Sequence, residues 1–117
     1  MNLTDLAKRI GARVVAEGHP GGRRADGVYA GDRISDLLTH ASQTTLLVTN
    51  LSSALLVCVA ELMDVPAICL VGGQSPTPEI ISAARAHGMF LMVSPVDLFE
   101  TCGRVYQCWN TAGPGGA

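Results

Sequence analysis

Short apolar runs alternate with stretches of helical periodicity along most of this chain. The runs at residues 67–71 and 89–93 are continuously apolar, and they flank a glycine turn and a helical segment. Continuous apolar runs of this length are typical of strands that are buried on both faces of a parallel sheet. The pattern therefore predicts a buried β-α-β unit at the centre of the fold.

The same alternation extends over the rest of the sequence. Helices are expected over residues 3–10, 34–40, from 52 or 53 to 63, 78–87 and 95–109. Strands are expected over residues 13–17, 28–30, 46–48, 67–71 and 89–93. Glycine and proline exclude a regular element from residues 18–27, which should form a mobile loop. Residues 111–117 are expected to form a flexible tail.

This order of elements predicts the fold class. Right-handed crossovers between parallel strands place helices on both faces of a sheet. We therefore expect a three-layer α/β/α domain with a mostly parallel sheet of about four to five strands. With 117 residues, the chain is long enough for one core and too short for a second domain. The single domain should span residues 1–110.

Polar residues mark where several helices should begin. The expected N-caps are Asp32, Ser52 or Ser53, Thr77 followed by Pro78, and Ser94 followed by Pro95. Residues 94–97 also match a capping box. A cap stabilises a helix by about 1 kcal/mol, so capping alone would explain each of these residues without any ligand.

The helix expected to end near residue 63 is apolar nearly all round. Burying a large apolar side chain is worth about 1.5–3 kcal/mol, so the second face should be covered by another helix or by a subunit. The residues assigned to a subunit contact are Leu55, Leu56, Val57 and Val59. Composition agrees, because charged residues make up only 15% of the chain, against about 25% in ordinary domains. We therefore expect a homodimer.

Charge and hydropathy exclude several classes of partner. The net charge of −2 and the single lysine, Lys8, argue against a nucleic-acid surface. The longest apolar stretch is shorter than the roughly 18 residues that a membrane span requires. Asp5, Lys8 and Arg9 stand where an export signal would need an apolar core. We therefore expect a cytoplasmic protein that binds neither nucleic acid nor membrane.

The four cysteines show no metal or redox spacing. Cys58 and Cys69 lie inside apolar runs, where cysteine behaves as a small hydrophobic residue. Cys102 and Cys108 are six positions apart, which separates them by about 120° around a helix and argues against a shared ligand face. Buried free thiols are therefore the favoured interpretation, and no metal site is expected.

No catalytic constellation is apparent either. His40 and His87 are expected at helix C-termini, where the helix dipole favours a cationic side chain, and His19 lies in the glycine-rich loop. Neither a phosphate-binding loop nor a nucleophile elbow occurs. An enzyme that uses Asp32 or His19 as a base would lack supporting residues. We therefore expect a non-enzymatic protein without a cofactor.

The best candidate site lies where the strands end. The carboxyl ends of parallel strands meet at one edge of a sheet, and four loops spaced about 4.8 Å apart span on the order of 15 Å, the size of a nucleotide. The candidate ligand-binding residues at this edge are Asp32, Asn50, Gly72, Gly73, Gln74 and Ser94. Helix N-terminal N–H groups and glycines suit an anion there.

Four segments also resemble the DRTGG domain, over about two thirds of the chain: residues 28–36, 46–50, 70–79 and 93–101. Gly72 and Gly73 match the glycines of that family, while its Asp-Arg pair is Asn50-Leu51 here. DRTGG domains occur beside CBS domains in regulated pyrophosphatases and are related in fold to the N-terminal domain of HPr kinase/phosphorylase. The resemblance implies an α/β regulatory or assembly module that tends to dimerise.

Two functions from different classes therefore stand side by side. The first is a non-catalytic regulatory or assembly module that self-associates and acts through protein contacts. The alternative is a sensor of a nucleotide or other small anion that binds at the carboxyl edge of the sheet. Measuring the oligomeric state tests the first function, and measuring the response of the protein to nucleotides tests the second.

Overall fold

The computed structural model describes residues 2–18, 24–51 and 53–112, with side chains described up to residue 109. Its helices are α1 (Leu3–Ile10), α2 (Ile34–His40), α3 (Ala54–Leu62), α4 (Pro78–Ala86) and α5 (Leu98–Ala112). Its strands are β1 (Arg13–Glu17), β2 (Gly27–Ala30), β3 (Thr45–Thr49), β4 (Ala67–Leu70) and β5 (Phe90–Val93). Every element predicted from the sequence is present, with differences only at the ends.

The strands form one sheet in the order β1-β5-β4-β3-β2. Strands β2, β3, β4 and β5 are parallel to one another, and β1 pairs antiparallel with β5. The register of the β1–β5 pair shifts between Val14 and Ala16, which marks a bulge in the edge strand. The prediction of a mostly parallel sheet is therefore confirmed, and the antiparallel edge is a feature that was not predicted.

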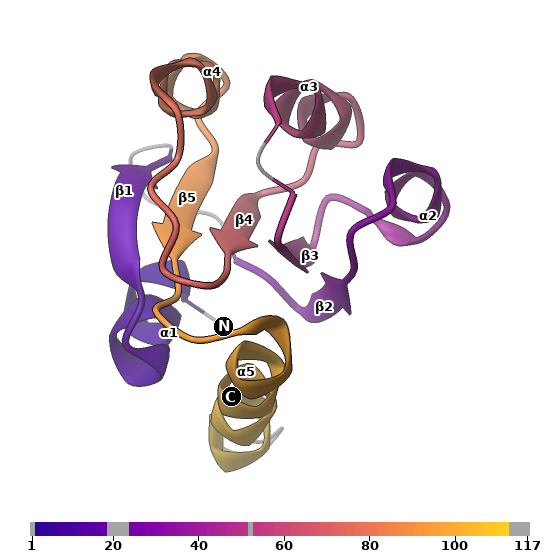
Figure 1. Cartoon of the computed structure of the whole chain (residues 1–117). Helices are drawn as coiled ribbons and strands as arrows, with labels where there is room; N and C mark the ends of the chain where they lie inside the picture. The colour runs from indigo at the N-terminus through magenta and orange to yellow at the C-terminus, as the bar shows by residue number, and fades with distance from the viewer. Residues whose placement is uncertain (1, 19–23, 52, 113–117) are drawn as a thin grey trace.

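Helices cover both faces of the sheet. Figure 1 shows α2, α3 and α4 on one face and α1 and α5 on the other. Side chains alternate along each strand, so Leu47 and Ile68 join the core beneath α2, α3 and α4. Their neighbours Val48 and Cys69 join the core beneath α1 and α5. This arrangement is the predicted three-layer α/β/α architecture.

Two of the predicted caps have the predicted geometry. The Thr77 side chain accepts a hydrogen bond from the Ile80 N–H, with Pro78 in the first turn of α4. The Ser53 side chain accepts from the Leu55 N–H at 3.1 Å and so begins α3. Residue 52 lies outside the described residues, as do residues 19–23 of the predicted loop and 113–117 of the predicted tail.

Two other predicted caps are wrong. Helix α2 has Arg33 at its N-cap, with no side-chain hydrogen bond, so Asp32 lies outside the helix. Helix α5 begins at Leu98, and the Asp97 carboxylate accepts from the Glu100 N–H at 2.9 Å. Asp97 therefore takes the capping role that the sequence pattern assigned to Ser94.

The Ser94 side chain instead fastens α5 to the end of β5. Ser94 and Thr101 are fully buried, and their hydroxyl oxygens lie 2.7 Å apart. The Thr101 hydroxyl also donates to the Val96 carbonyl at 3.2 Å. A buried hydroxyl requires a partner, so this pair fixes the first turn of α5 against the sheet.

Burial on α3 corrects part of the predicted subunit contact. Leu56 and Val57 are 1% and 0% exposed and belong to the chain's own core. Leu55 is 57% exposed, and Val59 is half-buried. Leu56 and Val57 are therefore covered by α2, α4 and the sheet within one chain, and only Leu55 and Val59 remain at the surface.

Among the described residues no helix combines the length and the apolar character needed to cross a membrane. Helix α5 continues to Ala112, so residues 111 and 112 of the expected tail are helical.

The contrast between Leu55 and Leu56 gives a first prediction. Leu56→Ala should lower the free energy of unfolding by about 2–5 kcal/mol, because it opens a cavity in the core. Leu55→Ala, the matched control at an exposed position, should change it by less than about 0.5 kcal/mol. Urea denaturation of the two variants measures both values, and equal losses would contradict the burial of Leu56.

The hydroxyl pair of Ser94 and Thr101 gives a second prediction. Ser94→Ala or Thr101→Val leaves one buried hydroxyl short of a partner and should cost about 1–3 kcal/mol of stability. The double variant should cost less than the sum of the two, because it removes both hydroxyls. Thr39→Val, at an exposed hydroxyl, is the control. Strictly additive losses would show that the two hydroxyls do not interact.

Candidate functional site

The four parallel strands bring their following loops to one edge of the sheet, which we call the rim. The rim comprises residues 31–33, 49–51, 71–74 and 94–97. Backbone hydrogen bonds continue past each strand end, from the Gly31 N–H to Val48 and from the Ser94 N–H to Leu70. The loops that hold the six candidate ligand-binding residues therefore do lie along one edge.

The glycine pair of the rim is used within the fold. Gly72 and Gly73 both have positive φ angles, 79° and 67°, which favour glycine. The Gly72 N–H donates to the Val96 carbonyl at 2.7 Å, and the Gly73 N–H donates to the Ser94 carbonyl at 2.8 Å. These two donors join the loop after β4 to the loop after β5, so they do not point into an open anion site.

Gln74 makes a second link between rim loops. Its Nε2 atom lies 3.1 Å from the Val71 carbonyl oxygen and 3.4 Å from the Asn50 carbonyl oxygen. The Thr49 hydroxyl oxygen accepts from the Leu51 N–H at 3.1 Å in the same turn. The amide of Gln74 therefore holds the loop after β3 to the loop after β4.

Two of the six candidate residues remain open to a ligand. The side chains of Asp32 and Asn50 are exposed at the ends of β2 and β3. Ser94 is fully buried and bonded to Thr101, so it is not available. The six candidate residues thus offer a carboxylate and an amide to a ligand, while the glycines, Gln74 and Ser94 hold the loops in place.

An aromatic cluster at the end of β2 was not predicted. The rings of Tyr29 and His40 are stacked, with centroids 5.1 Å apart and an angle of 18° between their planes. The pKa of the Tyr29 hydroxyl is raised, mainly by burial and to a lesser extent by the nearby Asp36 carboxylate. A Cβ on Gly31 would lie 3.2 Å from the Tyr29 ring, so glycine leaves room for the stack. The sequence carries no signal for this cluster, because its members come from separate elements.

The thiols agree with a structural role, with one correction. Burial raises the pKa of Cys69 to about 12, so this thiol stays protonated at neutral pH. Burial also raises the pKa values of Cys102 and Cys108. Cys58, predicted to be buried, is exposed on α3. No group of three metal-ligating side chains occurs within the part of the chain that the structure describes.

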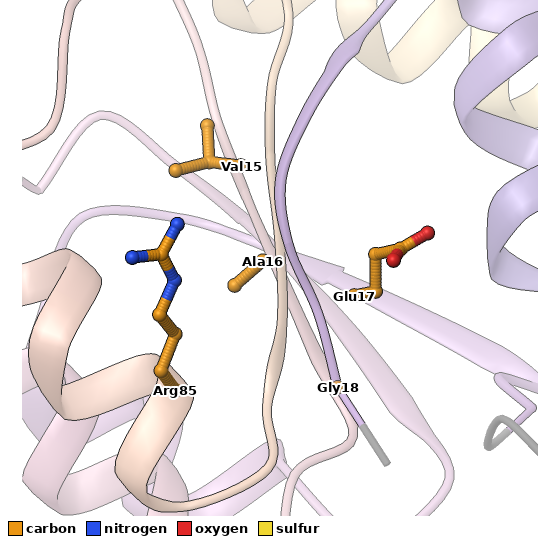
Figure 2. Close-up of a pocket in the computed structure, with 5 residues that line it drawn as sticks. All are labelled: Val15, Ala16, Glu17, Gly18 and Arg85. Atoms are coloured by element: carbon orange, nitrogen blue, oxygen red, sulfur yellow. The ribbon is translucent and has the colours of Figure 1, made fainter. Parts of the chain in front are cut away.

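A pocket of about 230 Å³ lies beside β1, lined by Val15, Ala16, Glu17, Gly18 and Arg85. Glu17 pairs with Phe90 at the start of β5, so this pocket lies at the edge of the sheet opposite the rim. Figure 2 shows Glu17 and Arg85 on opposite sides of the strand. Ligand pockets usually measure about 300–1,000 Å³. This pocket is smaller, and its two charged lining residues do not face each other across it.

No protein-family model matches the sequence, and no curated protein matches it either. Among solved structures, the chain is similar to the CBS and DRTGG domains of the regulatory region of Clostridium perfringens pyrophosphatase, in complex with the activator diadenosine tetraphosphate. The TM-score is 0.73 at 18% sequence identity, and the likeness covers 91% of this chain and 46% of that chain.

This chain therefore spans about half of that regulatory region. At this level of identity the likeness concerns the fold. The resemblance found in the four sequence segments is confirmed at that level, and the chain has a DRTGG-like α/β fold.

Proposed function

We propose that this chain is a non-catalytic regulatory or assembly module that self-associates and acts through protein contacts. One observation carries the proposal: large apolar side chains lie on the surface of α3 and α5. They are Leu55 (57% exposed), Leu62 (75%), Phe99 (88%) and Tyr106 (67%). A small domain with 15% charged residues gains by covering such side chains with a partner.

The non-catalytic part of the proposal is supported by how the polar groups of the rim are used. The Gly72 and Gly73 N–H groups, the Gln74 amide and the Ser94 hydroxyl all bond within the fold. The Cys69 thiol is protonated at neutral pH because it is buried. None of these groups is poised to act on a substrate.

The surface of α3 matches part of the contact expected from the sequence. Leu55 and Leu62 lie seven positions apart on one side of this helix, and Val59 is half-buried near them. Each large apolar side chain that becomes fully buried contributes about 1.5–3 kcal/mol. The surface of α5 is the other place where a second chain would gain apolar contact. A regulatory role in the cytoplasm stays a prediction from the sequence.

Sedimentation equilibrium of the full chain tests self-association. We expect a dimer at tens of micromolar protein. Because an apolar contact is not screened by salt, the dimer should persist when the NaCl concentration rises to about 1 M. A monomer throughout this range would contradict the proposal, and dissociation by salt would show that the contact is ionic rather than apolar.

A second candidate function is a small-ligand sensor at the rim. It is favoured by the similar regulatory region, which is described with the activator diadenosine tetraphosphate. Among the six candidate residues, Asp32 and Asn50 have the exposed polar side chains that could meet a nucleotide or another anion. Such a module would change its contacts with other proteins when the ligand binds.

A thermal-shift screen with adenine and guanine nucleotides and diadenosine tetraphosphate tests the sensor. A ligand at 100 times its dissociation constant stabilises the fold by about 2.7 kcal/mol, which raises Tm by several degrees. Asn50→Ala should reduce this shift, and Ser82→Ala, at an exposed position on α4, should not. A flat response to every nucleotide would contradict the sensor and leave the protein-contact module unaffected.

A further inference from the structure

We infer that the outer side of α5 is the surface on which a second copy of this chain docks, with a two-fold axis close to Gly103. The inference rests on the self-association proposed above and names its surface. The surface consists of Phe99, Gly103 and Tyr106, which we call the α5 stripe.

The α5 stripe lies on one side of the helix, because its members are spaced by four and three residues. The opposite flank faces α1, since Arg104 Nη1 donates to the Ile10 carbonyl at 2.8 Å. Phe99 and Tyr106 are about 140° to 160° around the helix from Arg104. The stripe therefore points away from α1, and Figure 1 shows no described helix on the outer side of α5.

The aromatic side chains of the stripe are unusually exposed. Phe99 is 88% exposed and Tyr106 is 67% exposed, whereas Val105, on the inner side of the same helix, is 2% exposed. Aromatic rings have large apolar surfaces and are enriched where proteins bind one another. Their exposure on a single stripe therefore marks this side of α5 as a contact surface.

The structure of a single chain does not explain why residue 103 is a glycine. Glycine within a helix destabilises it relative to alanine. Gly103 is not among the glycines with positive φ, and a Cβ placed there would meet no described atom within 4 Å. Neither backbone conformation nor crowding therefore requires glycine at this position. Glycine on a helix surface allows another backbone to approach closely. Such an approach by a second chain would explain the glycine at position 103.

The order of the stripe fits a second copy of the same chain. An aromatic residue, a glycine and an aromatic residue follow one another, so the stripe has the same pattern in both directions. A two-fold axis near Gly103 places each Phe99 against the partner's Tyr106 and brings the two glycines together. Two-fold dimers, whose interface is self-complementary, are the commonest oligomers.

The charges on α5 allow two copies to approach. The stripe itself carries no charged residue. Its neighbours Glu100 and Arg104 neutralise each other, with Arg104 Nη2 and Glu100 Oε2 2.8 Å apart. Like charges across an interface would oppose docking, and the neutral stripe avoids this repulsion.

The apolar area of the stripe is that of a weak contact. Aromatic side chains bury about 150–250 Å² each, so Phe99 and Tyr106 supply on the order of 300 Å² per chain. A standard interface needs about 800 Å² per partner. The contact is therefore expected to dissociate in the micromolar range.

A charge-swap experiment on the full chain tests the pairing by sedimentation equilibrium. Phe99→Lys and Tyr106→Glu should each raise the dimer dissociation constant at least about tenfold. The double variant should recover most of that loss, because each new cation then faces a new anion of the partner. Within one chain the two positions are about 10 Å apart along the helix, too far to pair with each other. Leu62→Glu on α3, the matched control at an exposed leucine, should leave the dimer unchanged.

Gly103→Ala provides a second readout in which two effects have opposite signs. In dilute, monomeric protein it should raise Tm by about 3 °C, because alanine favours the helix. At higher concentration it should raise the dimer dissociation constant several-fold, because the added methyl separates the two backbones. A higher Tm with an unchanged dissociation constant would overturn the role assigned to Gly103.

The outcomes separate this inference from the proposed function. A monomeric wild-type chain would overturn both. A dimer that survives Phe99→Lys and dissociates with Leu62→Glu would overturn the α5 surface, while self-association would stand with its contact on α3. Dissociation by both single variants without recovery in the double variant would overturn the two-fold pairing.

Discussion

The fold depends on burying its parallel sheet on both faces. Every residue of β3, β4 and β5 is buried, so consecutive side chains such as Leu47 and Val48 enter different cores. A sheet of this kind is stable only between two layers of helices. The helical layers are therefore required by the strands, and their outer sides keep exposed apolar side chains such as Leu62 on α3 and Phe99 on α5.

The rim shows how the loops at the end of such a sheet are held. Backbone N–H groups of Gly72 and Gly73 bond across to the loop after β5, and Gln74 bonds across to the loop after β3. These bonds fix the loops relative to one another before any ligand arrives. A ligand at Asp32 and Asn50 would meet a preformed edge rather than order it on binding.

Local patterns in the sequence were enough to predict the helices and strands, the three layers and the cap at Thr77. These features depend on residues that are close together in the sequence. Contacts between distant residues decided what could not be predicted. Ser94 fits a capping box locally, yet its hydroxyl pairs with Thr101, and Asp97 caps the helix instead. Leu56 looked available for a partner because its cover comes from separate elements. The same limit applies to the rim, where the partners of the glycine N–H groups lie in the loop after β5.

The bulge in β1 has a consequence for how this protein behaves in concentrated solution. A regular outer strand would offer an even row of N–H and C=O groups on which further strands could add without limit. The shift between Val14 and Ala16 interrupts that row and twists the strand locally. A chain with so few charges to keep its copies apart thereby loses one route to fibre growth at this edge of the sheet.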